Sequence, residues 1–331
     1  MSTTLETNNS DDYLDITVAI PTYNGEKRLP QVLDHLLNQT GIEHFKWEII
    51  VIDNNSSDNT SNIVSVYQEK NQEQPIISYY VEHQQGVGFA RLRAVREAKG
   101  NLVAFLDDDN LPDPNWLFAA YEFGLKYPTA GAWGGQIHAN FEVNPPENFA
   151  KIQAFLAIRE HGNKPYIFDA DNLRLPPGAA LVVRKQVWCE HVPKQPTLSG
   201  ALPGGDDYEA LLHIHKSGWQ VWYNPEMHTY HQIPKWRLEK DYLMRLAYGY
   251  GLCTFQLRLI NTKKWQMLII FIRTVLSNLR RILKHMIEYR QKIYQDLIIM
   301  FEIKFYWGSM LSPFYSIQLY FQRLRKSQNK I

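Results

Sequence analysis

The amino-acid sequence predicts an α/β fold: a mixed, mainly parallel sheet with helices on both faces, followed by a C-terminal helical extension. Two observations support this prediction. Short apolar runs alternate with helical patterns through the first hundred residues, and a basic, aromatic segment follows residue 234. Alternating strands and helices favour parallel strands, because each helix returns the chain to the same end of the sheet. No internal repeat or low-complexity segment interrupts the pattern.

The first two strands are expected at residues 16–20 and 48–52, which are short, apolar and rich in β-branched side chains. The motif from Pro21 to Gly25 ends the first strand. Apolar residues then recur at helical spacing from Leu29 to Leu37. The second strand ends at residues 53–60, a polar loop rich in helix-capping residues, and a helix is expected around residues 63–70.

A third strand is expected at residues 76–81. The helix that follows it opens at residues 86–88 and closes at Gly100. A fourth strand is expected at residues 102–106. The part from 113 to 234 contains many turn residues, and we expect strands there near 179–183 and 219–223. The segment 235–331 is expected to be helical.

The charge is divided unevenly along the chain. Residues 1–234 carry 17 Lys and Arg against 29 Asp and Glu, whereas residues 235–331 carry 18 against 5. An acidic body argues against nucleic acid as a partner, since that binding relies on basic surface. The basic, amphipathic C-terminal segment suits peripheral contact with an anionic membrane, or packing on the body. Its apolar runs are too short to span a bilayer.

Residues 1–14 are polar and are expected to form a disordered tail. They lack the basic start and apolar segment of a secretory signal. Cys189 and Cys253 show neither metal-ligand spacing nor a disulfide framework. Both features favour a cytoplasmic location.

The most informative motif is the acidic triplet Asp107, Asp108 and Asp109, directly after the fourth predicted strand. Adjacent carboxylates repel one another, and hard oxygen ligands suit Mg²⁺ or Mn²⁺. Ligands of open α/β sheets bind beyond the carboxyl ends of the strands. The triplet therefore predicts a metal-bound phosphate at this edge. Taken alone, an acidic, solvated turn explains it equally well.

Other polar residues are expected near the same edge. Asp53 suits hydrogen bonds to a base or ribose, or a helix cap, and Tyr23 suits stacking on a base or packing. Asp206 and Asp207 begin a predicted helix, where carboxylates are favoured by the helix dipole alone, but either one could act as a general base. The motif at 227–234 offers two histidines as further ligands, although most histidines are not ligands.

These motifs, in this order, resemble family 2 glycosyltransferases with the GT-A fold. The resemblance covers residues 15–234 and rests on four segments. They are Thr17–Gly25, Val51–Thr60, Phe105–Asn110 and Gly204–Asp207. Within that family, residues 175–179 and 230–234 are most similar to cyanobacterial enzymes of exopolysaccharide (hormogonium polysaccharide) assembly. The resemblance implies a nucleotide-binding half at 15–112 and an acceptor-binding half at 113–234.

The resemblance also implies roles for single residues. Pro21 and Tyr23 would line the base pocket, Asp53 would bind the base, and Asp108 would face the ribose. Asp107 and Asp109 would hold the divalent metal, Mg²⁺ or Mn²⁺. His231 is expected to contact the metal or a phosphate, with His228 as its rival. Asp207 would be the catalytic base, with Asp206 in place of the family's usual Glu. Arg91 is retained in a helix where the family's neighbouring Asn and Gly are absent, so a phosphate contact is expected from Arg91 alone.

The implied activity is a metal-dependent, inverting transfer of a sugar from a nucleoside diphosphate sugar, most commonly a UDP-sugar. The acceptor is expected to be a saccharide or a lipid-linked saccharide at the inner face of the cell membrane. One alternative is a sugar nucleotidyltransferase, although residues 22–28 contain only one of the glycines that such a loop requires. The other alternative is a non-catalytic protein that binds sugar nucleotides.

Overall fold

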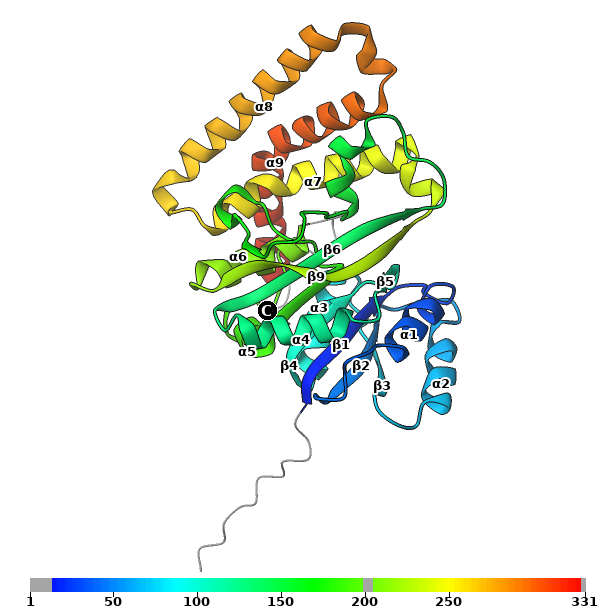
Figure 1. The fold of residues 1–331 in the computed structure, drawn as a ribbon. Helices are drawn as coiled ribbons and strands as arrows, with labels where there is room; N and C mark the ends of the chain where they lie inside the picture. The colour runs from blue at the N-terminus through cyan, green and yellow to red at the C-terminus, as the bar shows by residue number, and fades with distance from the viewer. Residues whose placement is uncertain (1–13, 199–204, 329–331) are drawn as a thin grey trace, which may run out of the picture.

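The computed structural model describes residues 14–198 and 205–328, which form one mixed nine-stranded sheet with helices on both of its faces (Figure 1). Strand order along the sheet is β3-β2-β1-β4-β8-β6-β9-β5, and β7 pairs with β9. The α/β fold class is therefore confirmed. The tail expected at residues 1–14 lies outside the described residues, apart from Leu14, which begins β1.

The first half of the sheet is parallel, as the sequence predicts. Its strands pair in the order β3-β2-β1-β4, and the three intervening helices connect them. The strands are β1 (Leu14–Thr22), β2 (Trp47–Asp53), β3 (Ile76–Val81) and β4 (Gly100–Leu106). The helices are α1 (Leu29–Leu37), α2 (Thr60–Lys70) and α3 (Val87–Glu97). All four strands deliver their carboxyl ends to one edge.

The second half of the sheet departs from the prediction: the short strands β5 and β7 were not expected, and two longer strands differ more. The long strand β6 (Ala130–Phe141) was not expected, and β9 runs over Gln220–Ile233, ten residues beyond the predicted end at 223. Neither strand was predicted in full, because β6 contains glycines and β9 contains a proline, and these residues disfavour strands. The glycines are needed here: a Cβ at Gly135 would lie 2.3 Å from the carbonyl oxygen of Met227.

The remaining strands complete this half. They are β5 (Asn110–Pro112), β7 (Tyr166–Ile167) and β8 (Ala180–Arg184). Strand β8 is antiparallel to β4 and β6, whereas β6 and β9 are parallel. Strand β5 is antiparallel to β9. This short pairing brings the residues that follow β4 against a strand 120 positions later in the chain.

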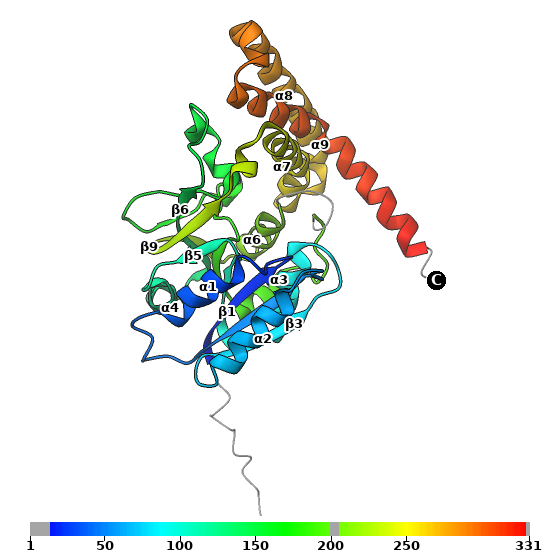
Figure 2. The same ribbon diagram turned by 90° about the vertical axis from the view of Figure 1, so that its right-hand side faces the viewer.

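Two hydrophobic cores flank the sheet. One face packs against α1, α2 and α4 (Trp116–Lys126), and the other against α3, α5 (Lys185–His191) and α6 (Asp206–Lys216). Figure 2 shows α1 and α4 on one side of the strands and α6 on the other. Apolar residues that alternate along each strand therefore find a core on either face.

The C-terminal region is helical, as expected. It comprises α7 (Lys240–Ile260), α8 (Met267–Tyr289) and α9 (Leu297–Gln328). Helices α7 and α9 cross closely at Gly251, which has no side chain to keep them apart. A Cβ at this position would lie only 2.5 Å from the carbonyl oxygen of Phe305. A third core joins α7 and α9 to the 3-10 helix η3 (Gln153–Leu156) and the end of β9. Within residues 14–198 and 205–328, no helix is long and apolar enough to cross a membrane.

Candidate active site

The acidic triplet lies in a turn at the carboxyl end of β4, where the amide of Asn110 donates a hydrogen bond to the Asp107 carbonyl at 3.0 Å. Each of its three carboxylates pairs with a different arginine. The pairs are Asp107 with Arg91, Asp108 with Arg28, and Asp109 with Arg237. The arginines come from three separate elements, so the repulsion among adjacent carboxylates is relieved from three directions.

Asp108 is bound by Arg28 at the start of α1. The guanidinium donates to both carboxylate oxygens, each at 2.9 Å, and Thr22 donates to one of them at 2.5 Å. The same guanidinium donates to the carbonyl of Tyr23 at 3.0 Å. Burial raises the pKa of Asp108, and the hydrogen bonds and charge of Arg28 oppose that rise. Asp108 therefore ties the triplet to the loop after β1.

Asp109, His231 and Arg237 form the second cluster. Arg237, in the 3-10 helix η5 (Lys235–Leu238), donates to the Asp109 carboxylate and to Nε2 of His231, both at 2.7 Å. His231 Nδ1 lies 2.9 Å from the Leu156 carbonyl, which can only accept, so Nδ1 carries the proton and Nε2 presents its lone pair. Burial opposes ionisation of Asp109, but the charges of Arg237 and Arg28 prevail and lower its pKa.

The strand register explains why His231 reaches the triplet and His228 does not. Asn110 in β5 lies directly opposite His231 in β9, which leaves His231 Nε2 3.5 Å from the Asp109 carboxylate. His228 instead lies 2.9 Å from His138, whose other ring nitrogen lies 2.9 Å from Glu160. Of the two predicted histidines, only His231 joins the acidic cluster.

The donor set at Asp109 fits a divalent cation that arrives with its substrate. A buried carboxylate oxygen and an imidazole lone pair converge on one point, and the Arg237 guanidinium supplies the positive charge there. The described residues contain no group of three or more His, Cys, Asp or Glu side chains arranged to hold a metal ion. Mg²⁺ is commonly held by one or two carboxylates, with the remaining positions filled by phosphates and water. The pair matches that arrangement and not a complete protein cage.

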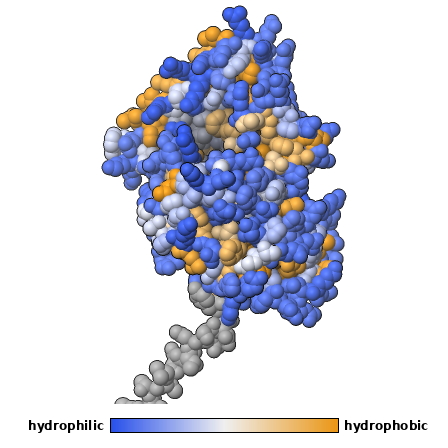
Figure 3. Space-filling model, viewed as in Figure 1, coloured by the Kyte–Doolittle hydropathy of each residue, from blue (hydrophilic) through white to orange (hydrophobic). Residues whose placement is uncertain are grey.

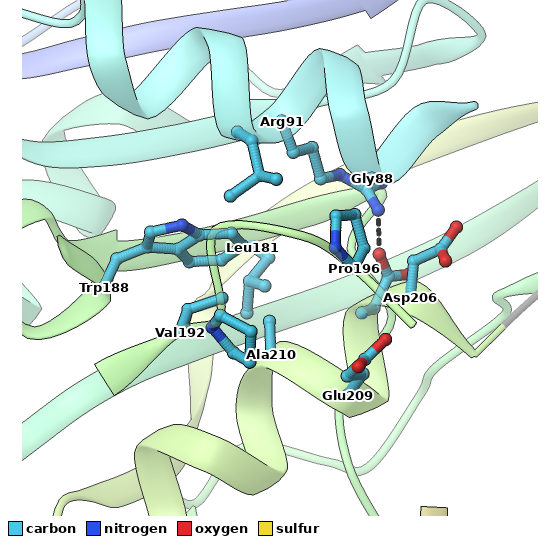
Figure 4. A pocket seen from close by; sticks show the side chains of 12 residues that line it. Gly88, Arg91, Leu181, Trp188, Val192, Pro196, Asp206, Glu209 and Ala210 are labelled. Atoms are coloured by element: carbon cyan, nitrogen blue, oxygen red, sulfur yellow. Dashed lines mark hydrogen bonds and ion pairs between the residues drawn. The ribbon is translucent and has the colours of Figure 1, made fainter. Parts of the chain in front are cut away.

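Arg91 links the triplet to the second predicted acidic motif. Its side chain is buried, and it forms ion pairs with Asp107, at 3.1 Å, and with Asp207 at the start of α6. The dashed line in Figure 4 marks the pair with Asp207, beside a small cavity between α3 and α6. The other oxygen of Asp207 accepts a hydrogen bond from the amide of Gly178 at 2.7 Å. Asp107 and Asp207, 100 positions apart, therefore share one cation.

Gly178 is needed for this arrangement. A Cβ at this position would lie 2.4 Å from an oxygen of Asp207 and 2.6 Å from Cζ of Arg91. Real Cβ atoms do not approach other atoms so closely, so a side chain here would displace one of the two groups. The Pro-Pro-Gly turn at 176–178 thus positions the Asp207 carboxylate with a backbone amide.

Asp206 differs from its neighbour. One of its carboxylate oxygens is buried and has no hydrogen-bond partner among the described residues. Burial raises its pKa to about 7, with a smaller contribution from Glu209, and the charge of Arg91 opposes the rise. Glu209 itself accepts hydrogen bonds from the amides of Thr197 and Leu198 and anchors that segment. The ion pair with Arg91 distinguishes Asp207 from Asp206.

The predicted base-binding residues lie around the loop after β1. Asp53 is buried at the end of β2, where it accepts hydrogen bonds from the Ser56 amide, at 2.7 Å, and from the Tyr79 hydroxyl. Both of its oxygens are thus engaged, but each retains a second lone pair. Tyr23 is 51% exposed and free to stack, whereas Pro21 is buried in β1.

Three residues that the sequence analysis did not single out belong to this site: Arg28, Gly178 and Arg237. Arg28 and Arg237 lie beside the motifs at 21–25 and 227–234, but a single arginine in a basic stretch carries no distinctive signal. Gly178 was noted only as part of a turn. Its role depends on contact with α6, which local sequence does not specify.

The raised pKa of Asp206 predicts a measurable pH dependence of stability. The folded protein keeps a proton that the unfolded chain releases near pH 4, so this stabilising contribution is present at low pH and is lost as pH rises to about 7. Between pH 5 and 8, wild type should therefore lose on the order of 2 kcal/mol more free energy of unfolding than Asp206→Asn. Urea unfolding at both pH values measures this difference.

Asp171→Asn, at a side chain that is 77% exposed, is the matched control and should follow wild type. Identical pH dependence for wild type and Asp206→Asn would show that Asp206 is ionised in the folded protein.

Comparison with known proteins gives a family match over just under half of the chain. Residues 17–179 match the model of Glycosyl transferase family 2. The Escherichia coli UDP-Glc:alpha-D-GlcNAc-diphosphoundecaprenol beta-1,3-glucosyltransferase WfgD is 34% identical over 133 residues, 40% of this chain and 47% of that protein. The Bacillus spizizenii poly(ribitol-phosphate) beta-glucosyltransferase is 33% identical over 111 residues, 34% and 17% of the two chains. The matched stretches thus cover less than half of either relative.

A solved structure shows the same fold over nearly the whole chain. The mannosyltransferase PcManGT from Pyrobaculum calidifontis, in complex with GDP-Man and Mn²⁺, superposes with a TM-score of 0.59 at 17% identity. The superposition covers 91% of this chain and 87% of that one. The acidic end of β4 and most of the sheet that carries it therefore lie in the stretch, residues 17–179, that matches Glycosyl transferase family 2, and the chain has the GT-A fold.

Proposed function

We propose that this protein is an inverting, metal-dependent glycosyltransferase that moves a sugar from a nucleoside diphosphate sugar to an acceptor hydroxyl. The observation that supports this most is that Arg91 forms ion pairs with both Asp107 and Asp207. One guanidinium therefore contacts both the end of β4 and the start of α6. A donor-side acidic cluster and a candidate base for the acceptor then lie side by side. A purely nucleotide-binding protein has no need for the second carboxylate.

On the donor side, Tyr23 and Pro21 form the wall of the base pocket, Asp53 binds the base, and Asp108 faces the ribose. Asp109 and His231 hold the divalent cation, Mg²⁺ or Mn²⁺, with Asp107 behind them. When bound, the cation neutralises charge that develops on the diphosphate leaving group. Arg237, which contacts both Asp109 and His231, would then be available to bind the diphosphate. An open groove against Asp109, Arg28 and Arg237 gives room for that group.

The donor is proposed to be a UDP-sugar. Related proteins of this fold have been solved with nucleotide sugars, including Staphylococcus aureus TarS 1-349 with UDP-GlcNAc. The WfgD relative is named for a UDP-Glc donor.

The acceptor side is a cavity of about 220 Å³ that opens beside Asp207. Aromatic side chains from the catalytic body (residues 15–234) and from the C-terminal helices line this cavity, together with Arg159. They are Phe155, Tyr208, Tyr250 and Phe305. Sugar rings pack their apolar faces on aromatic rings, and Arg159 suits an anionic group. The cavity therefore fits a saccharide, or a saccharide linked through phosphate to a lipid.

In the proposed step, the acceptor oxygen attacks the anomeric carbon as the bond from that carbon to the diphosphate oxygen breaks. Asp207 takes the proton of the acceptor hydroxyl, and the nucleoside diphosphate leaves on the opposite face. One displacement inverts the anomeric carbon. Arg91 and the Gly178 amide orient the two oxygens of Asp207 for this transfer.

We place the reaction in polysaccharide biosynthesis, of the exopolysaccharide type, at the inner face of the cell membrane. Support comes from the WfgD relative, whose name specifies a diphosphoundecaprenol-linked acceptor, and from the basic C-terminal region. On this proposal residues 15–112 bind the donor, residues 113–234 bind the acceptor together with Tyr250 and Phe305, and the C-terminal helices also meet the membrane.

Asp207→Asn tests the proposal directly. Loss of the general base should lower kcat by about 10²–10⁴-fold, because the acceptor proton has nowhere to go. Nucleoside diphosphate release from UDP-glucose, UDP-galactose, UDP-N-acetylglucosamine and GDP-mannose measures turnover, with and without Mn²⁺. UDP binding in the presence of Mn²⁺ should be retained. Turnover equal to wild type would remove Asp207 from the mechanism, and an absence of turnover by wild type across donors and acceptors would reject the proposed function.

Gly178→Ala tests positioning of Asp207 without removing it. The added methyl displaces Asp207 or Arg91, so kcat should fall by about 10–100-fold while the UDP dissociation constant changes little. Ser61→Ala, at an exposed position of α2, is the control. A crystal structure of the variant with Asp207 unmoved and kcat unchanged would contradict the assignment.

Arg237→Gln tests competition between this arginine and the cation. Removing the guanidinium frees the Asp109 oxygen and the His231 lone pair, so Mn²⁺ should bind about tenfold more tightly in the absence of nucleotide. Electron paramagnetic resonance of free Mn²⁺ measures this affinity without any turnover. Arg28→Gln removes a similar charge from Asp108 and is the control. Weaker Mn²⁺ binding by Arg237→Gln would contradict the proposed site.

A further inference from the structure

Helix α8 packs on the rest of the protein through its polar face. The residues that it buries are Thr274, Asn278 and Ile282, only one of which is apolar and large. The Asn278 side chain donates to the Ser309 hydroxyl of α9 at 3.0 Å, and His285 Nε2 lies 3.1 Å from Glu302 of α9. Hydrogen bonds therefore supply much of this contact, beside a short apolar one in which Phe271 lies against Phe255 of α7 and Phe314 of α9.

The apolar face of α8 points outward. Its large side chains recur every three or four residues along one side, and each is between 40% and 74% exposed. They are Leu268, Ile269, Ile272, Leu276, Leu279, Leu283, Met286 and Ile287. Figure 3 shows apolar atoms gathered along the outer edge that α8 forms in Figure 1. A surface helix normally turns such a stripe to the core, and a contiguous exposed patch marks an interaction site.

The side chains around the stripe indicate its partner. Arg273, Arg280 and Lys284 follow one border of the apolar face at helical spacing, and Glu288 is the only acidic residue in α8. Trp265 and Tyr294, just before and after the helix, are 68% and 82% exposed. Amphipathic rings of this kind sit at the boundary between lipid and water. An apolar stripe with a basic border and aromatic ends fits an anionic lipid surface.

A second copy of the chain fits the stripe less well. Two α8 helices packed through this face would bring their Arg273, Arg280 and Lys284 borders close together, with only Glu288 on each helix to compensate. Like charges across an interface oppose association. An anionic bilayer instead supplies both the apolar depth and the opposite charge.

We propose that α8 is a membrane-docking helix that lies in the plane of an anionic bilayer, with residues 268–287 inserted and the basic border at the headgroups. This inference rests on the proposed location of the protein at the membrane, and it assigns that location to one face of one helix. Docking there holds the catalytic body against the surface without any spanning segment.

Co-sedimentation with phosphatidylglycerol–phosphatidylcholine vesicles tests the docking helix, with pure phosphatidylcholine vesicles as the comparison. Wild type should sediment with the anionic vesicles. The double variant Leu276→Ser, Leu283→Ser should bind at least about tenfold more weakly, because it removes two inserted side chains. Leu125→Ser together with Ile76→Ser makes the same change at two exposed apolar residues of the catalytic body and should bind like wild type.

The triple variant Arg273→Gln, Arg280→Gln, Lys284→Gln isolates the charge. Its affinity for anionic vesicles should fall on the order of a hundredfold, since each basic residue near such a surface contributes about fivefold. Lys46→Gln together with Lys70→Gln, at exposed positions of the body, is the control. Thermal unfolding should be unchanged in every variant, because none of these side chains is buried.

The outcomes separate the two proposals. Wild type that remains in the supernatant with anionic vesicles, while it transfers sugar to a soluble acceptor, would reject the docking helix and leave the enzymatic proposal intact. Vesicle binding without turnover would do the reverse. A wild-type dimer in sedimentation equilibrium that the double leucine variant converts to monomer would show that a second copy occupies the stripe, and would also reject the docking helix.

Discussion

The arrangement of this site depends on one buried cation, Arg91. A guanidinium that is 4% exposed is costly to bury unless carboxylates compensate for it, and here Asp107 and Asp207 do so from opposite sides. The three groups therefore hold one another in place. Because Asp107 ends β4 and Asp207 begins α6, the ion pairs join the parallel half of the sheet to the half that follows it. Gly178 leaves the space that this contact requires.

The rest of the triplet follows the same rule. Burial disfavours charge on three adjacent aspartates, and each meets its own arginine; those arginines come from the start of α1, from α3 and from η5. In this state arginines supply the positive charge that a metal would bring. Arg237 illustrates the exchange most directly, since it contacts the same carboxylate and imidazole that would ligate a cation.

The sequence was sufficient to predict the parallel half of the fold, because that half repeats one local pattern of apolar strand, polar turn and amphipathic helix. It was insufficient for β6, where Gly134 and Gly135 read as turn residues. Their purpose is to let Pro176 and Met227 approach the strand. No local sequence pattern predicts these close contacts, because Pro176 and Met227 lie about 40 and about 90 residues later in the chain.

The candidate site divides in the same way. The acidic triplet, His231 and Asp207 were predicted from motifs, and the structure brings them to one edge. Their partners Arg28 and Arg237 were not predicted. Arg28 lies 80 positions from Asp108 and Arg237 lies 128 positions from Asp109, and ion pairs over such separations leave no periodic pattern in the sequence. The choice of His231 over His228 depended on the pairing of β5 with β9, and strand register is a property of the folded sheet.

The pairing of β5 with β9 also determines when the site can form during synthesis of the chain. Asp109 is synthesised long before its neighbours His231 and Arg237, and Arg91 long before Asp207. A nascent chain that has emerged only as far as α4 can pair its four parallel strands, but it lacks both the histidine and the second carboxylate. If the proposed mechanism holds, the site is therefore complete only once β9 has been translated and has paired with β5.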